Sequence, residues 1–214
     1  VRQADYKTEA EREGWALVWN GAWRKVEGAS WRKCGFDQDD DHPAVCVSWN
    51  DAVEFCNWLG RTSGRTVRLP TEAEWEYACR AGTETTYPWG QRPEDGNGWC
   101  NGADRSAAKK FQGLTIFEWY DGYVFTSPSG KFKANECGLY DMTGNAWQWC
   151  SDWYEAHKPR DAKDQTGPAS GTYRVTRGGS WNSGPDYCRP AARRQESPAT
   201  RTNMVGFRVV VEAP

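Results

Sequence analysis

Turn-forming residues recur so densely after Gly82 that they leave no room for long helices or strands. Gly, Pro, Asn and Asp separate single aromatic residues and isolated apolar pairs, a pattern typical of turns and irregular loops. The chain nevertheless holds 14 Trp and 22 Gly in 214 residues. Indole rings bury a large apolar area each, and glycine permits tight turns. We therefore expect an ordered protein with an aromatic core and many loops.

Two segments before Gly82 carry the signals of helix ends. The stretch from Ser48 to Asp51 is like a capping box, in which a side-chain oxygen accepts a hydrogen bond from an orphan amide. Apolar residues then share one helical face, and Gly60 is typical of a helix end. A second capping box runs from Thr71 to Glu74, and Ala81-Gly82 predicts where that helix ends. We expect two short helices, with a turn and a short strand between them.

The C-terminal stretch combines two framework ends with a polar insert. Residues 173–177 and 207–211 have strand-like patterns, and we expect them to be partners in a sheet. The segment between them is rich in Ser, Thr, Gln, Asn and Pro, and it has too few apolar residues to form core. Binding and chemistry concentrate in loops that a rigid scaffold holds. We therefore predict that this insert carries the function.

Composition excludes several classes of partner. A net charge of −2 gives no basic footprint for nucleic acid, and no apolar run is long enough to span a membrane. The chain contains no long linker, internal repeat or low-complexity tract. We expect residues 1–214 to form a single domain with a sizeable core.

Eight cysteines suggest either disulfides or buried thiols. None forms a Cys-x-x-Cys pair and only His42 and His157 accompany them, which argues against zinc fingers or ribbons. An even number of cysteines favours disulfides in an exported protein and small buried hydrophobes in a cytosolic one. Composition does not choose between these. We favour an extracellular or surface-exposed location because a cysteine pairing is implied below.

Four motifs give the sequence a specific resemblance. They run from Arg68 to Tyr77, from Gly138 to Trp149, from Arg177 to Trp181 and from Gly206 to Arg208. They resemble the formylglycine-generating enzyme family, also called the sulfatase-modifying-factor domain, and the resemblance extends from about Tyr6 to the C-terminus. It implies an irregular α+β fold of the C-type-lectin-like kind, with two short helices, small antiparallel sheets and much loop. It also implies that the family's first strands are lacking.

The resemblance allows a test for oxidase chemistry. The family includes copper-dependent oxidases that convert a sulfatase cysteine to formylglycine, using two insert cysteines whose soft thiolates hold Cu(I). The matching positions here are Ser183 and Cys188. A serine hydroxyl is hard and stays protonated, so we expect no copper and no catalytic residues. The resemblance further implies a disulfide between Cys79 and Cys188, tying the insert to the second helix.

Two oxygen-rich clusters resemble the family's calcium sites. Each combines two side-chain oxygens with two main-chain carbonyls, the donors that hard cations take. The first cluster consists of Asp141, Gly144, Ala146 and Gln148. The second cluster consists of Asn101, Gly102, Asp121 and Tyr123. Gln148 stands where the family usually has Glu, so we expect weaker binding in the first cluster. Ordinary Asx turns are the alternative, and the resemblance favours structural calcium.

Other candidate sites have simpler explanations. The acidic residues between Asp37 and Asp41, beside His42, are interpreted as solvated loop surface. A two-histidine iron site would need His42 and His157 to meet from distant parts of the chain. Trp147, Trp149 and Trp153 are interpreted as core and not as a platform for a ligand. No nucleophile elbow, phosphate loop or dinucleotide fingerprint is present.

The insert is thus predicted to be a binding surface. In the family's fold this region forms an exposed face, and its mixture of one aromatic with adaptable polar groups is typical of paratopes. We expect an unknown protein or surface ligand to be its partner. The residues expected to contact that ligand are Asn182, Ser183, Asp186, Tyr187, Arg194, Gln195, Glu196, Thr200, Thr202 and Asn203.

One branch of the family varies this region deliberately. In variable proteins of diversity-generating retroelements, adenine-directed mutagenesis changes chosen codons within a fixed framework. The resemblance makes Ser183, Asp186 and Tyr187 candidates for varied positions, whereas Gln195 and Glu196 cannot arise from an Asn codon in this way. We expect a non-catalytic binding module. The alternative function is an oxidase acting on a peptide cysteine, or a related iron oxidase.

Overall fold

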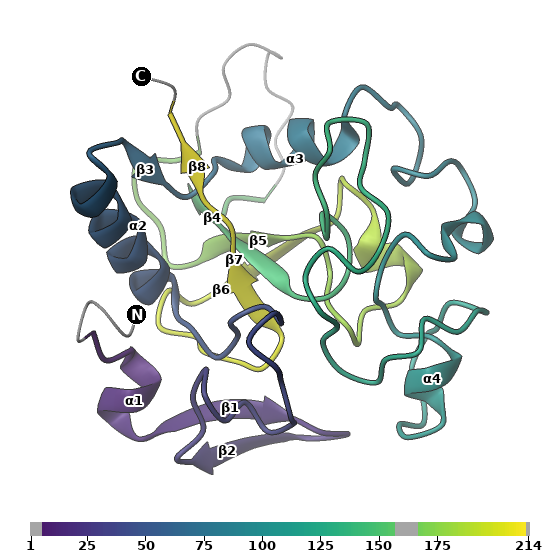
Figure 1. The fold of residues 1–214 in the computed structure, drawn as a ribbon, viewed down its shortest axis with the longest axis horizontal. Coiled ribbons are helices and arrows are strands. Elements are labelled where there is room, and N and C mark those ends of the chain that lie inside the picture. Colours follow the sequence, from purple (N-terminus) through teal and green to yellow (C-terminus); the bar gives the residue numbers. More distant parts are fainter. Residues whose placement is uncertain (1–5, 157–166, 213–214) are drawn as a thin grey trace.

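The computed structural model describes residues 6–156 and 167–212. Its central sheet consists of β4 (Trp147–Trp153), β5 (Arg174–Arg177), β6 (Arg193–Glu196) and β7 (Val205–Phe207). The strand order is β6-β5-β4-β7, with loops and short helices around the sheet (Figure 1). Strand β5 is antiparallel to β4 and β6, whereas β4 and β7 are parallel. The fold is α+β, as expected, but the central sheet is mixed.

Two smaller sheets have two antiparallel strands each. They are β1 (Trp15–Trp19) with β2 (Trp23–Glu27), and β3 (Val67–Arg68) with β8 (Val210–Val211). The β1–β2 hairpin lies at the bottom of Figure 1, below β7. It is joined to the C-terminal part of the chain, because Leu17 N donates to Arg201 O at 3.0 Å. The hairpin therefore stands beside the C-terminal part of the insert.

Short helices surround the sheets. They are α1 (Glu9–Glu13), α2 (Trp49–Ser63), α3 (Glu72–Arg80) and α4 (Arg105–Ala108), with the 3-10 turns η1 (Pro93–Gly96) and η2 (Pro185–Cys188). Both predicted capping boxes are confirmed, with Ser48 and Thr71 as the N-caps. A third capping box, at Thr8, begins α1. None of the helices in the described ranges has the length and apolarity needed to cross a bilayer.

The end of α2 differs from the prediction. The helix continues through Gly60 and ends at Gly64, which adopts the left-handed conformation (φ 68°) and donates from its N–H to Gly60 O. A Cβ at Gly60 would lie 3.1 Å from Arg65 O. Gly60 thus allows a close approach of the following chain and does not end the helix.

The predicted pairing of the two C-terminal strands is also wrong. Strand β5 does not pair with β7 or β8, because β4 lies between β5 and β7. Strand β4 pairs on both sides, with Trp149 opposite Thr176 of β5 and opposite Phe207 of β7. Trp147 and Trp149 are buried, as predicted, whereas Trp153 at the end of β4 is half-buried. That these residues belong to a central strand was not predicted from the sequence.

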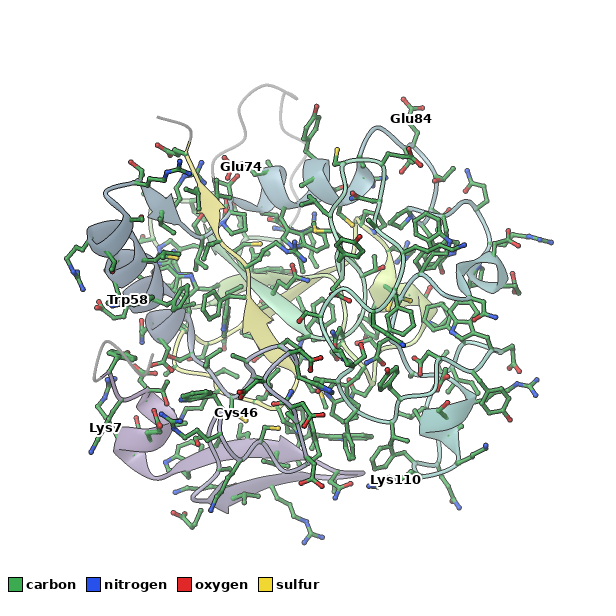
Figure 2. All side chains as sticks on the ribbon, viewed as in Figure 1. Lys7, Cys46, Trp58, Glu74, Glu84 and Lys110 are labelled. Carbon is green, nitrogen blue, oxygen red and sulfur yellow. The ribbon has the colours of Figure 1, made fainter. Side chains whose placement is uncertain are left out.

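Aromatic side chains fill the interior. Trp147, Trp149 and Trp181 are at most 1% exposed and pack with residues of α2 and β7. Two of the buried indoles have acceptors, since Trp149 Nε1 donates to Val47 O (3.2 Å) and Trp181 Nε1 to Asn203 O (3.0 Å). The side chains drawn in Figure 2 occupy the space between the ribbons. The loop-rich fold is therefore held by packing around the sheet more than by long regular elements.

The cysteines are all free thiols. Seven are buried and Cys137 is exposed. Cys79 packs with the group that includes Cys150, and burial raises its thiol pKa to about 12. Cys188 belongs to a different group, which includes Cys100. The predicted Cys79–Cys188 disulfide is therefore wrong, because the two side chains enter separate parts of the core.

Candidate ligand-binding site

A cavity of about 690 Å³ lies between the insert, the β1–β2 hairpin and residues 113–115. Its lining comes from four separate parts of the chain, so the fold and not a local motif creates it. The structure brings six of the ten predicted ligand residues to its wall. These six are Asn182, Ser183, Asp186, Tyr187, Arg194 and Gln195.

The other four predicted residues do not line this cavity. Glu196 follows Gln195 in β6 and forms an ion pair with Arg194 at 2.5 Å. Thr200 closes a turn by donating from its N–H to a main-chain carbonyl. Thr202 is buried, and Asn203 is fully buried, with its side-chain amide bonded to the main-chain N and O of Trp19 at 3.0 Å each. Thr202 and Asn203 are thus framework residues.

Glycines shape the start of the insert. Gly178 and Gly179 have φ values of 100° and 78°, a conformation that residues with a Cβ rarely adopt. A Cβ at Gly179 would lie 3.0 Å from Cys188 Sγ. The turn that follows is closed by Ser183, whose N–H donates to Ser180 O (2.8 Å) and whose Oγ accepts from Ser180 N (3.0 Å). The turn therefore fixes Ser183 at the cavity wall.

The η2 turn sorts its side chains into buried and exposed ones. Cys188 is fully buried, whereas Tyr187 is 56% exposed and Asp186 is also exposed. The insert packs closely against the backbone of Thr115 at Gly184, where a Cβ would lie only 2.4 Å from Thr115 O. Close backbone packing thus holds η2 in place while its two polar-tipped side chains project outward.

Sequence reasoning missed the aromatic wall opposite the insert. Trp19 and Trp23 from the hairpin, Trp147 from β4 and Tyr154 after it all line the cavity. Trp19 and Trp23 are paired across the hairpin. The Asn-Gly step between them is a hairpin signal that could have predicted this pair. Nothing in the sequence indicates that the hairpin faces a segment more than 150 residues away.

The two arginines at the cavity are already paired. Arg193 donates to both carboxylate oxygens of Glu72, at 2.5 and 2.7 Å, and its guanidinium lies over the ring of Tyr154. Arg194 pairs with Glu196 and lies 5.7 Å from the centroid of Trp147. These bonds orient the guanidinium groups and compensate their charge. The positive charge at this wall is therefore neutralised by the protein itself.

The residues at the family's copper positions do not fit a soft metal ion. Ser183 Oγ accepts from Ser180 N and lies 3.2 Å from Ser180 Oγ, so a hydroxyl bonded into a turn stands at the first position. Cys188 is fully buried and its Sγ donates to Ser183 O at 3.7 Å, and its proximity raises the pKa of the Cys100 thiol. A thiol that is enclosed in the core in this way is a structural cysteine and reacts poorly. No oxidation step can be derived from this pair.

The second oxygen cluster fits a hard cation. Asn101 Oδ1 is buried and has no hydrogen-bond partner. Asp121 lies at the residue that follows Asn101, because its carboxylate accepts from Gly102 N (3.1 Å) and from Tyr123 N (2.7 Å). Burial, with a smaller effect of the neighbouring Asp104, raises the pKa of Asp121 to about 7. A cation here would give the orphaned oxygen a partner and compensate the carboxylate.

The first oxygen cluster fits a cation less well. Gln148 Oε1 already accepts from Trp75 Nε1 (2.7 Å) and from Arg208 Nε (2.5 Å). The same guanidinium bonds the carbonyls of Tyr140 and Asp141. Asp141 Oδ1 alone remains buried and unpartnered. Gln148 therefore has no free lone pair to offer, and the Arg208 charge occupies the approach to this cluster.

The remaining metal candidates find no support. Within the described ranges, no group of three or more His, Cys, Asp and Glu side chains is placed to hold a metal ion. His42 Nδ1 lies 3.0 Å from Thr126 Oγ1. His157 lies outside the described residues. An iron site built on His42 and His157 thus has no observation behind it.

Comparison with known proteins places the chain in a family. Residues 1–213 match the model of the sulfatase-modifying factor enzyme 1-like domain, and the chain belongs to this family. It is 36% identical over 241 residues to the formylglycine-generating enzyme of Bos taurus, covering 99% of this chain and 61% of the relative. The chain thus spans less than two thirds of that relative's length.

Two solved structures are similar in fold. The structure of PvdO from Pseudomonas aeruginosa matches with a TM-score of 0.75 and 26% identity, covering 99% of this chain and 74% of that one. Treponema denticola variable protein 1 matches with a TM-score of 0.67 and 26% identity, covering 85% of this chain and 77% of that one. The relatives in sequence thus include proteins named as enzymes, and the similar solved structures include one named as a variable protein.

Proposed function

We propose that the chain is a non-catalytic binding module whose ligand occupies the cavity between the insert and the hairpin. The observation that carries the proposal is Ser183, a hydroxyl held in a turn where the family's oxidases need a thiolate. The cavity volume of about 690 Å³ is within the range of roughly 300–1,000 Å³ for ligand sites. Its lining combines aromatic rings with amide, hydroxyl and carboxylate groups, which gives both apolar area and polar selectivity.

We extend the proposal to diversification of the insert. The similarity to Treponema denticola variable protein 1 supports it, as does the contrast between exposed Asp186 and Tyr187 and buried Trp181 and Cys188. Exposed positions tolerate exchange, whereas buried ones do not. A near-identical template repeat differing at adenines, beside a reverse-transcriptase gene in the neighbouring DNA, would establish this. Without such a repeat, the module is an undiversified binder.

We also propose a structural calcium ion in the second cluster, held by Asn101, Gly102, Asp121 and Tyr123. The unpartnered Asn101 Oδ1 and the raised pKa of Asp121 support it. Such an ion would fix the loop that packs behind the insert, since Ala103 N donates to Ser183 O at 2.9 Å. It would therefore support the cavity wall and take no part in a reaction.

The rival function is tested with the oxidase reaction itself. The chain is mixed with Cu(I) under reducing conditions and then incubated in air with a peptide containing Cys-x-Pro-x-Arg. The bovine formylglycine-generating enzyme serves as the positive control. We expect mass spectrometry to show no aldehyde in the peptide. Aldehyde that disappears in the Cys188→Ala variant would overturn the binding proposal and establish an oxidase.

A further inference from the structure

The charged side chains at the cavity wall differ in whether the protein itself supplies a partner of opposite charge. Arg193 and Arg194 each have a carboxylate partner within the protein. Asp186 lines the same cavity and is exposed, yet its carboxylate forms no hydrogen bond or ion pair in the described part of the chain. The neighbouring Arg189 donates from Nε to the main-chain oxygen of Asp186 (3.0 Å) and does not line the cavity. The uncompensated charge at this wall is therefore negative.

Exposed aromatic faces accompany this carboxylate. Tyr187 follows Asp186 in η2 and is 56% exposed, and Trp23 on the hairpin is 47% exposed. Both line the cavity, and Tyr187 packs edge-on against Trp147 at 6.1 Å, which limits the orientations of its ring. The face of an aromatic ring attracts cations. A carboxylate and two rings in one cavity form the combination that recognises an organic cation.

We propose that the cavity binds a lysine or arginine side chain presented by a partner protein, with Asp186 as its counter-ion and Trp23 and Tyr187 as its aromatic walls. The inference rests on the proposed function and names the ligand class for that site. A side chain on a protein segment fits better than a free ammonium ion. The volume of about 690 Å³ leaves room for several residues, and Asn182 and Gln195 supply amides along the wall.

The test selects ligands from a random peptide library displayed on phage. Selection is carried out on the wild-type chain, on Asp186→Asn and on a filled variant. The filled variant combines Thr115→Trp with Gln195→Trp, two exposed positions at which an added indole occupies the cavity. Asp40→Asn is the matched control, because Asp40 is exposed, lies outside the cavity and undergoes the same charge change. Thermal unfolding checks that every variant is folded.

We expect the enriched peptides to contain Lys or Arg. We expect synthetic copies to bind Asp186→Asn about fivefold more weakly than the wild type, and Asp40→Asn unchanged. Binding should weaken as salt is added. Enriched peptides that lack basic residues, or that bind Asp186→Asn as tightly as the wild type, would overturn the ligand class and leave the binding function standing. If no peptide prefers the wild type over the filled variant, the proposed function itself fails.

Discussion

The aromatic framework and the insert meet at Trp147, yet the two regions use their side chains in opposite ways. In the framework, Trp149 is fully buried and its indole N–H group has an acceptor. In the insert, Tyr187 is exposed and the Asp186 carboxylate has no partner in the described ranges. Buried, bonded groups determine stability, whereas exposed groups are free to contact a ligand. We therefore predict that substitutions in the framework will lower stability, and that substitutions in the insert will weaken binding with little loss of stability.

The largest effect on stability is expected in the framework. Trp149→Ala removes a fully buried indole between β5 and β7, and we expect a loss of about 3–5 kcal/mol in the free energy of unfolding. Urea denaturation measures it. Tyr187→Ala is the matched change in the insert and should cost only about 0.5 kcal/mol. Equal losses of unfolding free energy in the two variants would contradict the predicted difference between framework and insert.

A buried ion pair between β5 and α3 should give a smaller loss in the free energy of unfolding. Arg177 is 1% exposed, hydrogen-bonds Glu76 and forms an ion pair with Glu72. Glu76→Gln leaves the guanidinium with Glu72 at 3.3 Å, and we expect it to cost roughly 2 kcal/mol, short of the full cost of breaking a buried pair. Glu118→Gln breaks the exposed pair with Arg105 and should leave the midpoint of the same denaturation experiment nearly unchanged. A larger loss from Glu118→Gln would contradict this ranking.

Local signals predicted the framework better than long-range ones. The starts of α2 and α3 follow from capping boxes whose partners lie three residues apart. The place of β4 between β5 and β7 depends on contacts across more than 50 residues, which no local pattern encodes. The insert was predicted as the site from its polarity, but the opposing wall at Trp19 and Trp23 depends on where the hairpin packs.

The cysteine prediction failed for a related reason. The family resemblance suggested a pairing of Cys79 with Cys188, but a disulfide depends on which side chains share a part of the core. Cys79 lies inside α3 near Cys150, and Cys188 lies beneath the insert near Cys100. Sequence spacing does not carry that information.

The cation proposed behind the insert predicts a dependence on pH. The folded pKa of Asp121 is about 7, above its ordinary value of 3.8. Protonated Asp121 therefore makes its full contribution to the free energy of unfolding below about pH 4. This contribution is lost as pH rises through about 7. Without calcium, we expect Asp121→Asn to be more stable than the wild type at pH 8, by on the order of 1–2 kcal/mol, and equal to it at pH 4.

Calcium should reverse that order. Thermal unfolding at pH 8 is measured with calcium chloride and with EGTA. We expect calcium to raise the Tm of the wild type and to leave Asp121→Asn unchanged, because a ligand that binds only the folded state stabilises it. If calcium leaves the Tm of the wild type unchanged, the second cluster does not bind a calcium ion.

The smallest effect on the fold is expected at Cys137. Its thiol is exposed, whereas the other seven are buried. Ellman's reagent should therefore modify one thiol rapidly in the native chain, and all eight after denaturation without reductant. Modification of Cys137 alone should change the Tm little. Cys137→Ser should abolish the rapid phase. Fewer than eight thiols in the denatured chain would show that some cysteines are paired.

The central claim is that Ser183 removes the copper chemistry and leaves a binding cavity. Its most direct test is a titration in which the reduced chain competes with a chromogenic chelator for Cu(I). Because the position five residues before Cys188 offers a bonded hydroxyl, we predict that the wild type takes no Cu(I) from the chelator. Stoichiometric uptake by the wild type that Cys188→Ala abolishes would contradict the account.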